Sequence, residues 1–380
     1  MDESPSELAL VLSGGGARGA YQVGFLRHLA RRYPDLPVPI LTGASAGAVN
    51  AIHLASHSGR FADRVEELTH LWTGLSVEQV FRVDAWSLLP RSLRWVVQLG
   101  LLGGRRHVPQ GRGLVDTAPL RSFLHRALQT RDGALPGIEE NLRQGSLRAI
   151  ALSTTHYGSS STVTFCQGRE VGAWERPQRH SVLTRLRVDH VMASAALPLF
   201  FPAVEIGHQW FGDGSIRLHS PLAPAVHLGA GKILAVSTRA PAPARSAGPS
   251  EPADYPPPAQ ILGVLFNAVF LDLLDQDALR LERINRLLSM ARSDAAPGLR
   301  PVDLLVLRPS IELGEIAADY EPRLPGLFRF LTRRLGTRQQ RGRDLLSMLM
   351  FQGDFLRRII ELGEADADAR ADEIARFIES

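Results

Sequence analysis

A serine at position 45 lies in the stretch Gly43-Ala44-Ser45-Ala46-Gly47, which fits the pattern G-x-S-x-G. In this pattern, small residues let the backbone turn sharply between a strand and a helix, so the serine stands on a strained, exposed turn. A serine presented in this way is suited to nucleophilic attack on an ester carbonyl. The pattern also arises by chance in glycine-rich chains, so its structural context decides its meaning.

A glycine-rich stretch precedes the serine: residues 14–19 read Gly-Gly-Gly-Ala-Arg-Gly and fit G-x-G-x-x-G. A dinucleotide site would need an acidic residue at the end of the next strand, where the chain has Thr42. A phosphate loop would need Lys-Ser or Lys-Thr after the glycines, and neither follows. Free N–H groups at a helix start still favour negative charge, and the oxyanion of acyl transfer needs the same donors.

Predicted strands and helices place the two stretches together. Residues 8–12 are all apolar, as expected of a strand buried on both faces of a parallel sheet, and residues 38–42 form a second short strand. Helices are predicted over residues 21–33 and 46–57. Because parallel strands end at the same edge of a sheet, the glycine loop and Ser45 should face each other.

The motifs GGGARG, GASAG and Asp213-Gly214 resemble those of the patatin-like phospholipase family over roughly residues 8–238. The resemblance implies a three-layer α/β/α fold with a mainly parallel central sheet. It also implies a Ser-Asp dyad with Ser45 as the nucleophile and Asp213 as the general base. The implied oxyanion hole consists of Gly14, Gly15 and Gly16. The other residues that match the motifs, and are expected to support them, are Arg18, Gly19, Gly43, Gly47 and Gly214.

One position departs from the family pattern. The family usually has Asp-Gly-Gly or Asp-Gly-Ala, whereas this chain has Ser215 after Asp213-Gly214. Serine is small, so the departure affects fine geometry more than identity. Trp210 and Phe211 are expected to desolvate the Asp213 carboxylate and raise its pKa, which would make it a better base. Residues 193–198, Ala-Ser-Ala-Ala-Leu-Pro, are similar to another family motif, for which a structural role is expected.

Two further questions stay open at the level of sequence. Arg18 either holds a phosphate or pairs with a carboxylate in the loop. His219, His227 and His53 compete for the role of base, although a lone histidine is more often a packed or solvated residue. We therefore expect a dyad and not a triad.

The expected organisation extends beyond the motifs. The predicted regions are a catalytic domain over residues 6–239, a Pro-rich linker or loop over 240–258, and a mostly helical C-terminal region over 259–380 with one strand near 302–307. That late strand should join the main sheet, because a lone strand has nowhere else to pair. Two arginine-bearing apolar stretches, 86–102 and 328–360, are read either as packed helices or as contacts with an anionic membrane.

Composition limits the class of protein. With 380 residues, 44% of them hydrophobic and 22% charged, the chain is expected to be globular. The single cysteine, Cys166, cannot form an internal disulfide, and the start of the chain lacks the features of a signal peptide. We predict a cytoplasmic protein without a membrane span, with peripheral membrane association as an alternative. Lys232 is the only lysine, so arginine carries nearly all the positive charge, which suits phospholipid head groups.

The sequence therefore predicts a serine acyl-ester hydrolase of the phospholipase A or lysophospholipase type, which releases a fatty acid from lipid through an acyl-enzyme. The alternatives are an acyltransferase with the same dyad and a non-catalytic lipid-binding protein of the same fold. No cofactor, metal or nucleic-acid partner is expected, because no clustered set of His, Asp and Glu with ligand spacing was recognised. Head-group, positional and chain-length preference, an activating partner and the oligomeric state are not determined.

Overall fold

A computed structural model describes residues 7–82, 113, 115–198, 200–241, 273–290, 299–321 and 343–380. Its strands are β1 (Leu8–Leu12), β2 (Ile40–Ala44), β3 (Ala149–His156), β4 (Ser161–Gly168), β5 (Glu175–Arg176), β6 (Arg179–Leu183), β7 (Val204–Ile206), β8 (Gln209–Asp213), β9 (Lys232–Val236) and β10 (Asp303–Leu307). Two short 3₁₀ helices are η1 (Gly16–Arg18) and η2 (Gly214–Arg217). The α-helices of the first two thirds are α1 (Gly19–Arg32), α2 (Ala46–Ser56), α3 (Phe61–Thr73), α4 (Val77–Val80), α6 (Ala118–Ala127), α7 (Pro136–Gln144), α8 (Val188–Ser194) and α9 (Ala223–His227). The later ones are α11 (Leu273–Met290), α12 (Leu313–Tyr320), α14 (Arg343–Leu349), α15 (Gly353–Ala369) and α16 (Ala371–Glu379).

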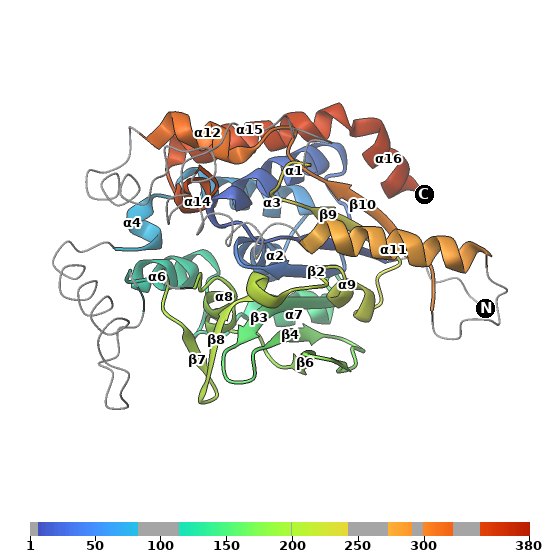
Figure 1. The fold of residues 1–380 in the computed structure, drawn as a ribbon, viewed down its shortest axis with the longest axis horizontal. Coiled ribbons are helices and arrows are strands. Elements are labelled where there is room, and N and C mark those ends of the chain that lie inside the picture. The colour runs from blue at the N-terminus through green and yellow to red at the C-terminus, as the bar shows by residue number, and fades with distance from the viewer. Residues whose placement is uncertain are drawn as a thin grey trace, which may run out of the picture.

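The described strands form one sheet whose centre is parallel (Figure 1). Strands β10, β9, β1, β2 and β3 lie side by side in this order, and each neighbouring pair is parallel. Beyond β3 the sheet continues with β4, which pairs antiparallel with β3. Strand β8 pairs antiparallel with both β7 and the last residues of β3. The predicted α/β fold with a mainly parallel sheet is therefore confirmed.

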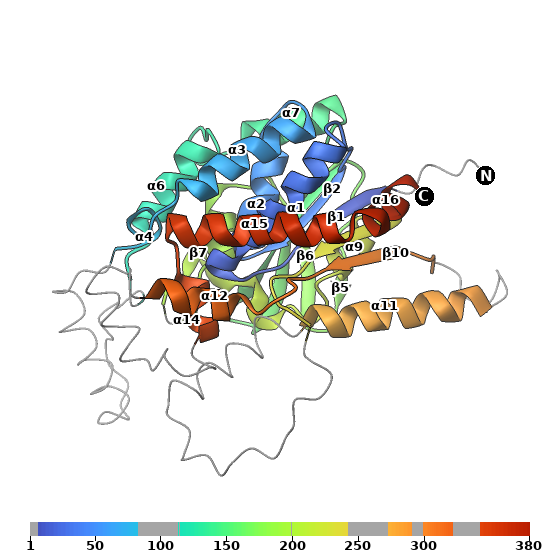
Figure 2. The same cartoon turned by 90° about the horizontal axis from the view of Figure 1, so that it is seen from above.

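Two cores, one on each face of the sheet, create the three layers. In β1, Leu10 and Leu12 belong to one core, whereas Ala9 and Val11 belong to the other, because successive side chains of a strand point to opposite faces. Helices α1 and α2 pack in the first core, and α9 and α11 pack in the second. The view from above shows these helix groups on opposite sides of the sheet (Figure 2). Burial of both faces explains why β1 is continuously apolar.

The C-terminal part of the chain is built into the same sheet and core. The strand predicted near residues 302–307 is confirmed as β10, which pairs parallel with β9 at the edge of the sheet. Helix α15 packs along α1, with Phe355, Leu356, Ile359 and Ile360 buried. The apolar stretch 86–102 and most of the Pro-rich segment 240–258 lie outside the described residues. In the described part, none of the helices is both long and apolar enough to cross a lipid bilayer.

Candidate active site

Ser45 stands at a strained turn between β2 and α2. Its backbone has φ 54° and ψ −126°, a positive φ that non-glycine residues seldom adopt. The flanking glycines are required by close backbone contacts. A Cβ on Gly47 would lie 2.1 Å from the carbonyl oxygen of Leu12, and one on Gly43 would lie 2.4 Å from the carbonyl oxygen of Gly47. The tight strand-to-helix turn that the sequence pattern predicted is therefore present.

The glycine loop lies directly beside this turn. A Cβ on Gly14 would come within 3.1 Å of the Ser45 Cβ, so the two backbones approach closely. Gly15 and Gly16 have φ of 150° and 58°, which favour glycine, and Gly16 opens η1 ahead of α1. None of the described hydrogen bonds uses the N–H group of Gly14, Gly15 or Gly16 as its donor. These N–H groups remain available to a negatively charged oxygen.

Strand register explains why Asp213 meets Ser45. Strand β2 ends at Ala44, which lies opposite Ser153 of β3. The next residue of β3, Thr154, pairs with Asp213 at the end of β8. The carboxylate and the serine that follows Ala44 are thus brought together by consecutive positions on β3, although they are far apart in sequence. The structure therefore brings together Ser45, Asp213 and the glycine loop.

The Asp213 carboxyl is fully buried. Burial raises its pKa to about 6, although the Ser45 hydroxyl and the Ser215 backbone and hydroxyl act in the opposite direction. One carboxyl oxygen, Oδ1, accepts a hydrogen bond of 2.8 Å from the Ser215 N–H. The other, Oδ2, is buried without a described hydrogen-bond partner, as is the Ser215 hydroxyl. The site thus holds a carboxylate oxygen that is available to take up a proton.

The two residues that were expected to desolvate the Asp213 carboxyl differ in their own burial. Phe211 is buried, in agreement with its assigned desolvating role, whereas Trp210 is 40% exposed. Adjacent strand residues point to opposite faces, so both cannot cover the same side chain. The backbone of Asp213 is held in place, because its N–H donates to the Ala196 carbonyl and its carbonyl accepts from the Thr155 hydroxyl.

Ser194 holds the nucleophile turn in place, a role that the sequence pattern around it did not specify. Its hydroxyl accepts a hydrogen bond of 3.1 Å from the Ser45 N–H and donates one of 2.7 Å to the Ser153 carbonyl. Ser194 is fully buried at the end of α8. The structural role expected for residues 193–198 is thus a specific contact, in which the Ser194 hydroxyl links the serine turn to β3.

An apolar pocket opens beside Ser45. Its wall is formed mainly by α2, α3, α6 and α14, and apart from Ser45 and His53 the side chains that line it are apolar. They include Val49, Leu68, Leu71, Trp72, Leu124, Phe201, Met348 and Phe351. Sequence reasoning missed this pocket, because apolar residues at helical spacing give the same signal whether they fill a core or surround a cavity. A hydrocarbon chain is the natural occupant of such a space.

Arg18 pairs with a carboxylate, which was one of the two alternatives that the sequence left open. The carboxylate comes from Asp344 of α14 and not from the loop, at 2.6 Å from Nη2. The Arg18 Nε also donates to the Ser347 hydroxyl at 2.6 Å. Arg18 is fully buried and does not line the apolar pocket. In addition, a Cβ on Gly16 would lie 2.2 Å from the Met348 carbonyl oxygen, so α14 rests directly on the glycine loop.

The three histidines that competed for the role of base have other surroundings or partners. His219 is exposed, and the His227 ring stacks on Trp174 at a centroid distance of 4.8 Å. The His53 Nε2 contacts the Arg64 carbonyl oxygen at 3.2 Å. Burial, followed by the neighbouring His57, lowers the pKa of His53 to about 3. No described hydrogen bond connects any of the three to Ser45 or Asp213.

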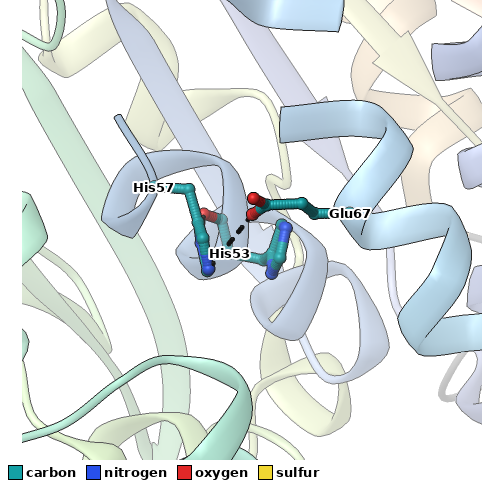
Figure 3. Close-up of side chains that lie close together, drawn as sticks. All are labelled: His53, His57 and Glu67. Atoms are coloured by element: carbon teal, nitrogen blue, oxygen red, sulfur yellow. Dashed lines mark hydrogen bonds and ion pairs between the residues drawn. The ribbon is translucent and has the colours of Figure 1, made fainter. Parts of the chain in front are cut away.

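His53 also belongs to a cluster with His57 and Glu67, whose potential ligand atoms lie within 4.8 Å of one another (Figure 3). This set was not predicted from the sequence, although the two histidines are four residues apart. The two rings are stacked, with centroids 3.9 Å apart and planes at 26°. Their lone pairs lie in the ring planes and therefore run side by side instead of converging on one point. The arrangement is a stacked pair with His57 and Glu67 3.5 Å apart.

Comparison with solved structures gives matches of low sequence identity. Human GIVD cytosolic phospholipase A2, in complex with methyl γ-linolenyl fluorophosphonate, is 14% identical with a TM-score of 0.48, over 98% of this chain and 58% of that one. VipD from Legionella pneumophila is 13% identical with a TM-score of 0.35, over 94% and 67%. ExoU in its complex with SpcU from Pseudomonas aeruginosa is 15% identical with a TM-score of 0.27, over 97% and 59%. This chain therefore spans less than two thirds of the phospholipase A2 chain and of the ExoU chain in its complex with SpcU.

The family model identifies the chain more directly. No curated protein matches it in sequence. The model of the patatin-like phospholipases matches residues 10–226, which is more than half of the 380 residues. The matched region contains the glycine loop, the Ser45 turn and Asp213. The protein therefore belongs to the patatin-like phospholipase family, and this membership supports a lipid acyl hydrolase activity.

Proposed function

We propose that this protein is a serine acyl-ester hydrolase of the phospholipase A or lysophospholipase type, with Ser45 and Asp213 as its catalytic dyad. One observation carries the proposal. Ser45, which has a strained backbone, and Gly16 line an apolar pocket, Gly14 lies against Ser45, and the Ser45 hydroxyl acts on the buried Asp213 carboxyl. This combination provides a nucleophile, a base, oxyanion donors and space for an acyl chain.

The chemistry follows from the roles of these groups. The Ser45 Oγ attacks the ester carbonyl carbon while its proton passes to the Asp213 carboxylate. The negative charge that forms on the carbonyl oxygen is stabilised by the N–H groups of Gly14, Gly15 and Gly16. When the ester bond breaks, the leaving alcohol takes the proton from Asp213 and an acyl-enzyme remains. Water then attacks the acyl carbon, gives a proton to Asp213 and releases the fatty acid, after which Ser45 regains its proton.

The first test is covalent labelling of Ser45. A fluorophosphonate probe should label the wild-type protein at this residue, because the probe imitates the tetrahedral oxyanion that the glycine loop would stabilise. Ser45→Ala should remove labelling and lower ester hydrolysis by roughly a thousandfold or more. Mass spectrometry of the labelled peptide and product analysis on defined lipids provide the measurements.

Ser194→Ala provides the matched control, because Ser194 touches the same turn without carrying the nucleophile. It should retain labelling at Ser45, at a lower rate. A folded wild-type protein that takes no label would contradict the proposal and favour the non-catalytic lipid-binding alternative. Products esterified to an added alcohol in place of free fatty acid would favour the acyltransferase alternative.

The apolar pocket predicts a preference that depends on acyl-chain length. Val49 lies one helical turn after Ser45 and lines the pocket, so Val49→Phe should fill the space beyond the first carbons of the chain. We expect kcat/KM for long-chain esters to fall roughly tenfold more than for short-chain esters, since one altered pocket contact usually contributes about 1–3 kcal/mol. Kinetics on a series of p-nitrophenyl esters measures this ratio.

Val226→Phe is the control for this substitution. Val226 is partly buried on α9, on the opposite face of the sheet, and does not line the apolar pocket. It should lower both rates to a similar extent if it has any effect. Equal loss for long and short esters in Val49→Phe would show that the acyl chain lies elsewhere.

Lipid is the proposed partner, and peripheral contact with a membrane follows because phospholipid substrates reside there. We propose this contact, together with the cytoplasmic location predicted from the sequence, as parts of the same function. Liposome binding and fractionation of cells are the corresponding measurements.

A further inference from the structure

Helix α11 exposes an unusual amount of apolar surface. Four of its large hydrophobic side chains point into solvent, and their exposed fractions are 66% for Leu279, 42% for Ile284, 61% for Leu287 and 79% for Met290. Scattered exposed apolar residues are normal in soluble proteins, but several on one helix form a patch. Such a patch indicates a surface that contacts something apolar.

The opposite side of α11 fixes the helix to the domain. Leu274 and Ala278 are buried in the core beneath the sheet, where α9 also packs. The Asp277 carboxylate accepts a hydrogen bond of 2.9 Å from the Leu222 N–H. The Asn285 side chain both donates to the Val302 carbonyl and accepts from its N–H. A different side of α11 therefore packs against the domain, and the exposed apolar residues are additional to those that hold the helix in place.

The charges on the outer side are mainly positive. Arg280, Arg283 and Arg286 recur every third residue and are exposed, and the one exposed acidic side chain among them is Glu282. None of the described ion pairs involves these three arginines. Arginines next to exposed leucine and methionine are typical of helices that lie in the interface of an anionic bilayer. The charge pattern thus selects an anionic lipid surface over an uncharged apolar partner.

Helix α15 also carries exposed arginines and provides a comparison for α11. It belongs to the arginine-bearing stretch 328–360, for which membrane contact was an alternative. In the described part of that stretch, Phe355, Leu356, Ile359 and Ile360 of α15 are buried, whereas Arg357 and Arg358 are exposed. Arg358 also lies 3.7 Å from Glu361. Positive charge without exposed apolar side chains gives weak attraction to a bilayer at most. Of these two helices, α11 is the one that combines exposed arginines with exposed large apolar side chains.

We propose that the outer face of α11 is the surface by which this protein docks on an anionic lipid bilayer. The face consists of Leu279, Arg280, Arg283, Ile284, Arg286, Leu287 and Met290. The inference rests on the proposed function, since it concerns how a lipid hydrolase meets its substrate. The helix begins beside the catalytic edge of the sheet, where Leu274 lines a second pocket together with Gly14 and Ser215.

Vesicle flotation of the full chain tests the proposal. Ser45→Ala is used as the background so that the lipids stay intact. Binding is measured to vesicles of phosphatidylcholine alone and of phosphatidylcholine mixed with phosphatidylglycerol. We expect preference for the mixed vesicles, and a loss of roughly tenfold or more in the partition coefficient for the double variant Arg283→Glu, Arg286→Glu. A second double variant, Leu287→Gln, Met290→Gln, should lose binding to a similar extent while its charge is unchanged.

Matched controls separate the surface from general charge and from folding. Arg357→Glu, Arg358→Glu makes the same charge change on α15 and should bind like the parent. The same α11 substitutions made in wild-type protein should leave hydrolysis of a soluble short-chain ester unchanged, which shows intact folding independently of docking. If none of the proteins, wild type included, hydrolysed the short-chain ester, the proposed function would be overturned. The vesicle-binding measurements would still test the docking surface.

Three outcomes would contradict the docking surface. The first is vesicle binding that is the same in both α11 double variants as in the parent. The second is an equal loss in the α15 control. The third is concentration-dependent self-association, measured by analytical ultracentrifugation, that disappears in the α11 variants while lipid binding does not change, which would assign this face to a second copy of the chain.

Discussion

Replacing Asp213 by Asn is expected to lower ester hydrolysis by roughly 10²–10⁴-fold, because the amide cannot take the proton from Ser45. The substitution keeps the shape of the side chain and an oxygen that accepts from the Ser215 N–H. The turn that presents Ser45 should therefore stay intact. Steady-state kinetics on a soluble ester measures the loss, and the kcat value reports the chemical step.

The pH dependence of wild-type activity provides a second test of the role of the Asp213 carboxyl. The base must be unprotonated, and burial raises the pKa of Asp213 to about 6. Activity should therefore be low below this pH, rise through it and level above it. An acid limb near pH 4 would mean that the acting carboxylate is not the buried one.

Stability should respond in the opposite direction from activity. The pKa of Asp213 is about 6 in the folded protein and near 3.8 when the group is unperturbed. Between these values the unfolded chain holds fewer protons, so the contribution of this group to stability falls as pH rises. Asp213→Asn removes the buried charge, and it should leave the free energy of unfolding unchanged or increase it at neutral pH.

His219→Ala is the control for the identity of the base. His219 is exposed six residues after Asp213 and should be dispensable. If His219→Ala abolished hydrolysis while Asp213→Asn retained it, a histidine-based mechanism would replace the dyad.

Replacing Arg18 by Met is expected to destabilise the protein by about 3 kcal/mol, because it removes one partner of a buried ion pair. Arg18 is fully buried, and it holds both Asp344 and Ser347 of α14. Methionine has similar length, so the change in packing is small compared with the loss of the charge and its hydrogen bonds. Chemical denaturation followed by circular dichroism measures the free energy of unfolding.

The effect should reach the active site as well. Helix α14 rests on Gly16 and contributes Met348 to the apolar pocket, so its release should lower kcat/KM for long-chain esters. Arg31→Met is the matched control, because Arg31 pairs with Glu364 and Asp368 from a side chain that is 57% exposed. It should cost less than about 1 kcal/mol. Equal destabilisation by the two substitutions would show that the contact between Arg18 and α14 contributes no more to stability than an exposed ion pair.

The sequence by itself determined the local units of the site. The strand before the glycines, the helix after them and the turn at Ser45 are encoded by neighbouring residues: an apolar run, three glycines and a pair of glycines around a serine. Backbone sterics at these positions allow few alternatives, since Gly15 and Gly16 adopt positive φ and Gly43 and Gly47 touch other backbone atoms. Local rules therefore sufficed for these strands, helices and turns, whereas the three-layer fold was implied by the resemblance to a family.

The resemblance to a family added Asp213, which local patterns did not specify. Its partner role depends on the register of β8 against β3, and register is set by pairing between segments far apart in the chain. The raised pKa was expected, and of the two residues assigned to desolvate the carboxyl, Phe211 is buried whereas Trp210 is 40% exposed.

Only the tertiary structure decided which distant residues complete the site. Arg18 is 326 residues from Asp344, and no feature of either residue predicts the other. The apolar pocket and the outer face of α11 are built from the same kinds of residues, leucine above all, yet one is enclosed and the other exposed. The physical reason is that burial is a property of the packed chain: hydrophobic attraction has no direction, so only the arrangement of the helices determines which apolar faces are covered.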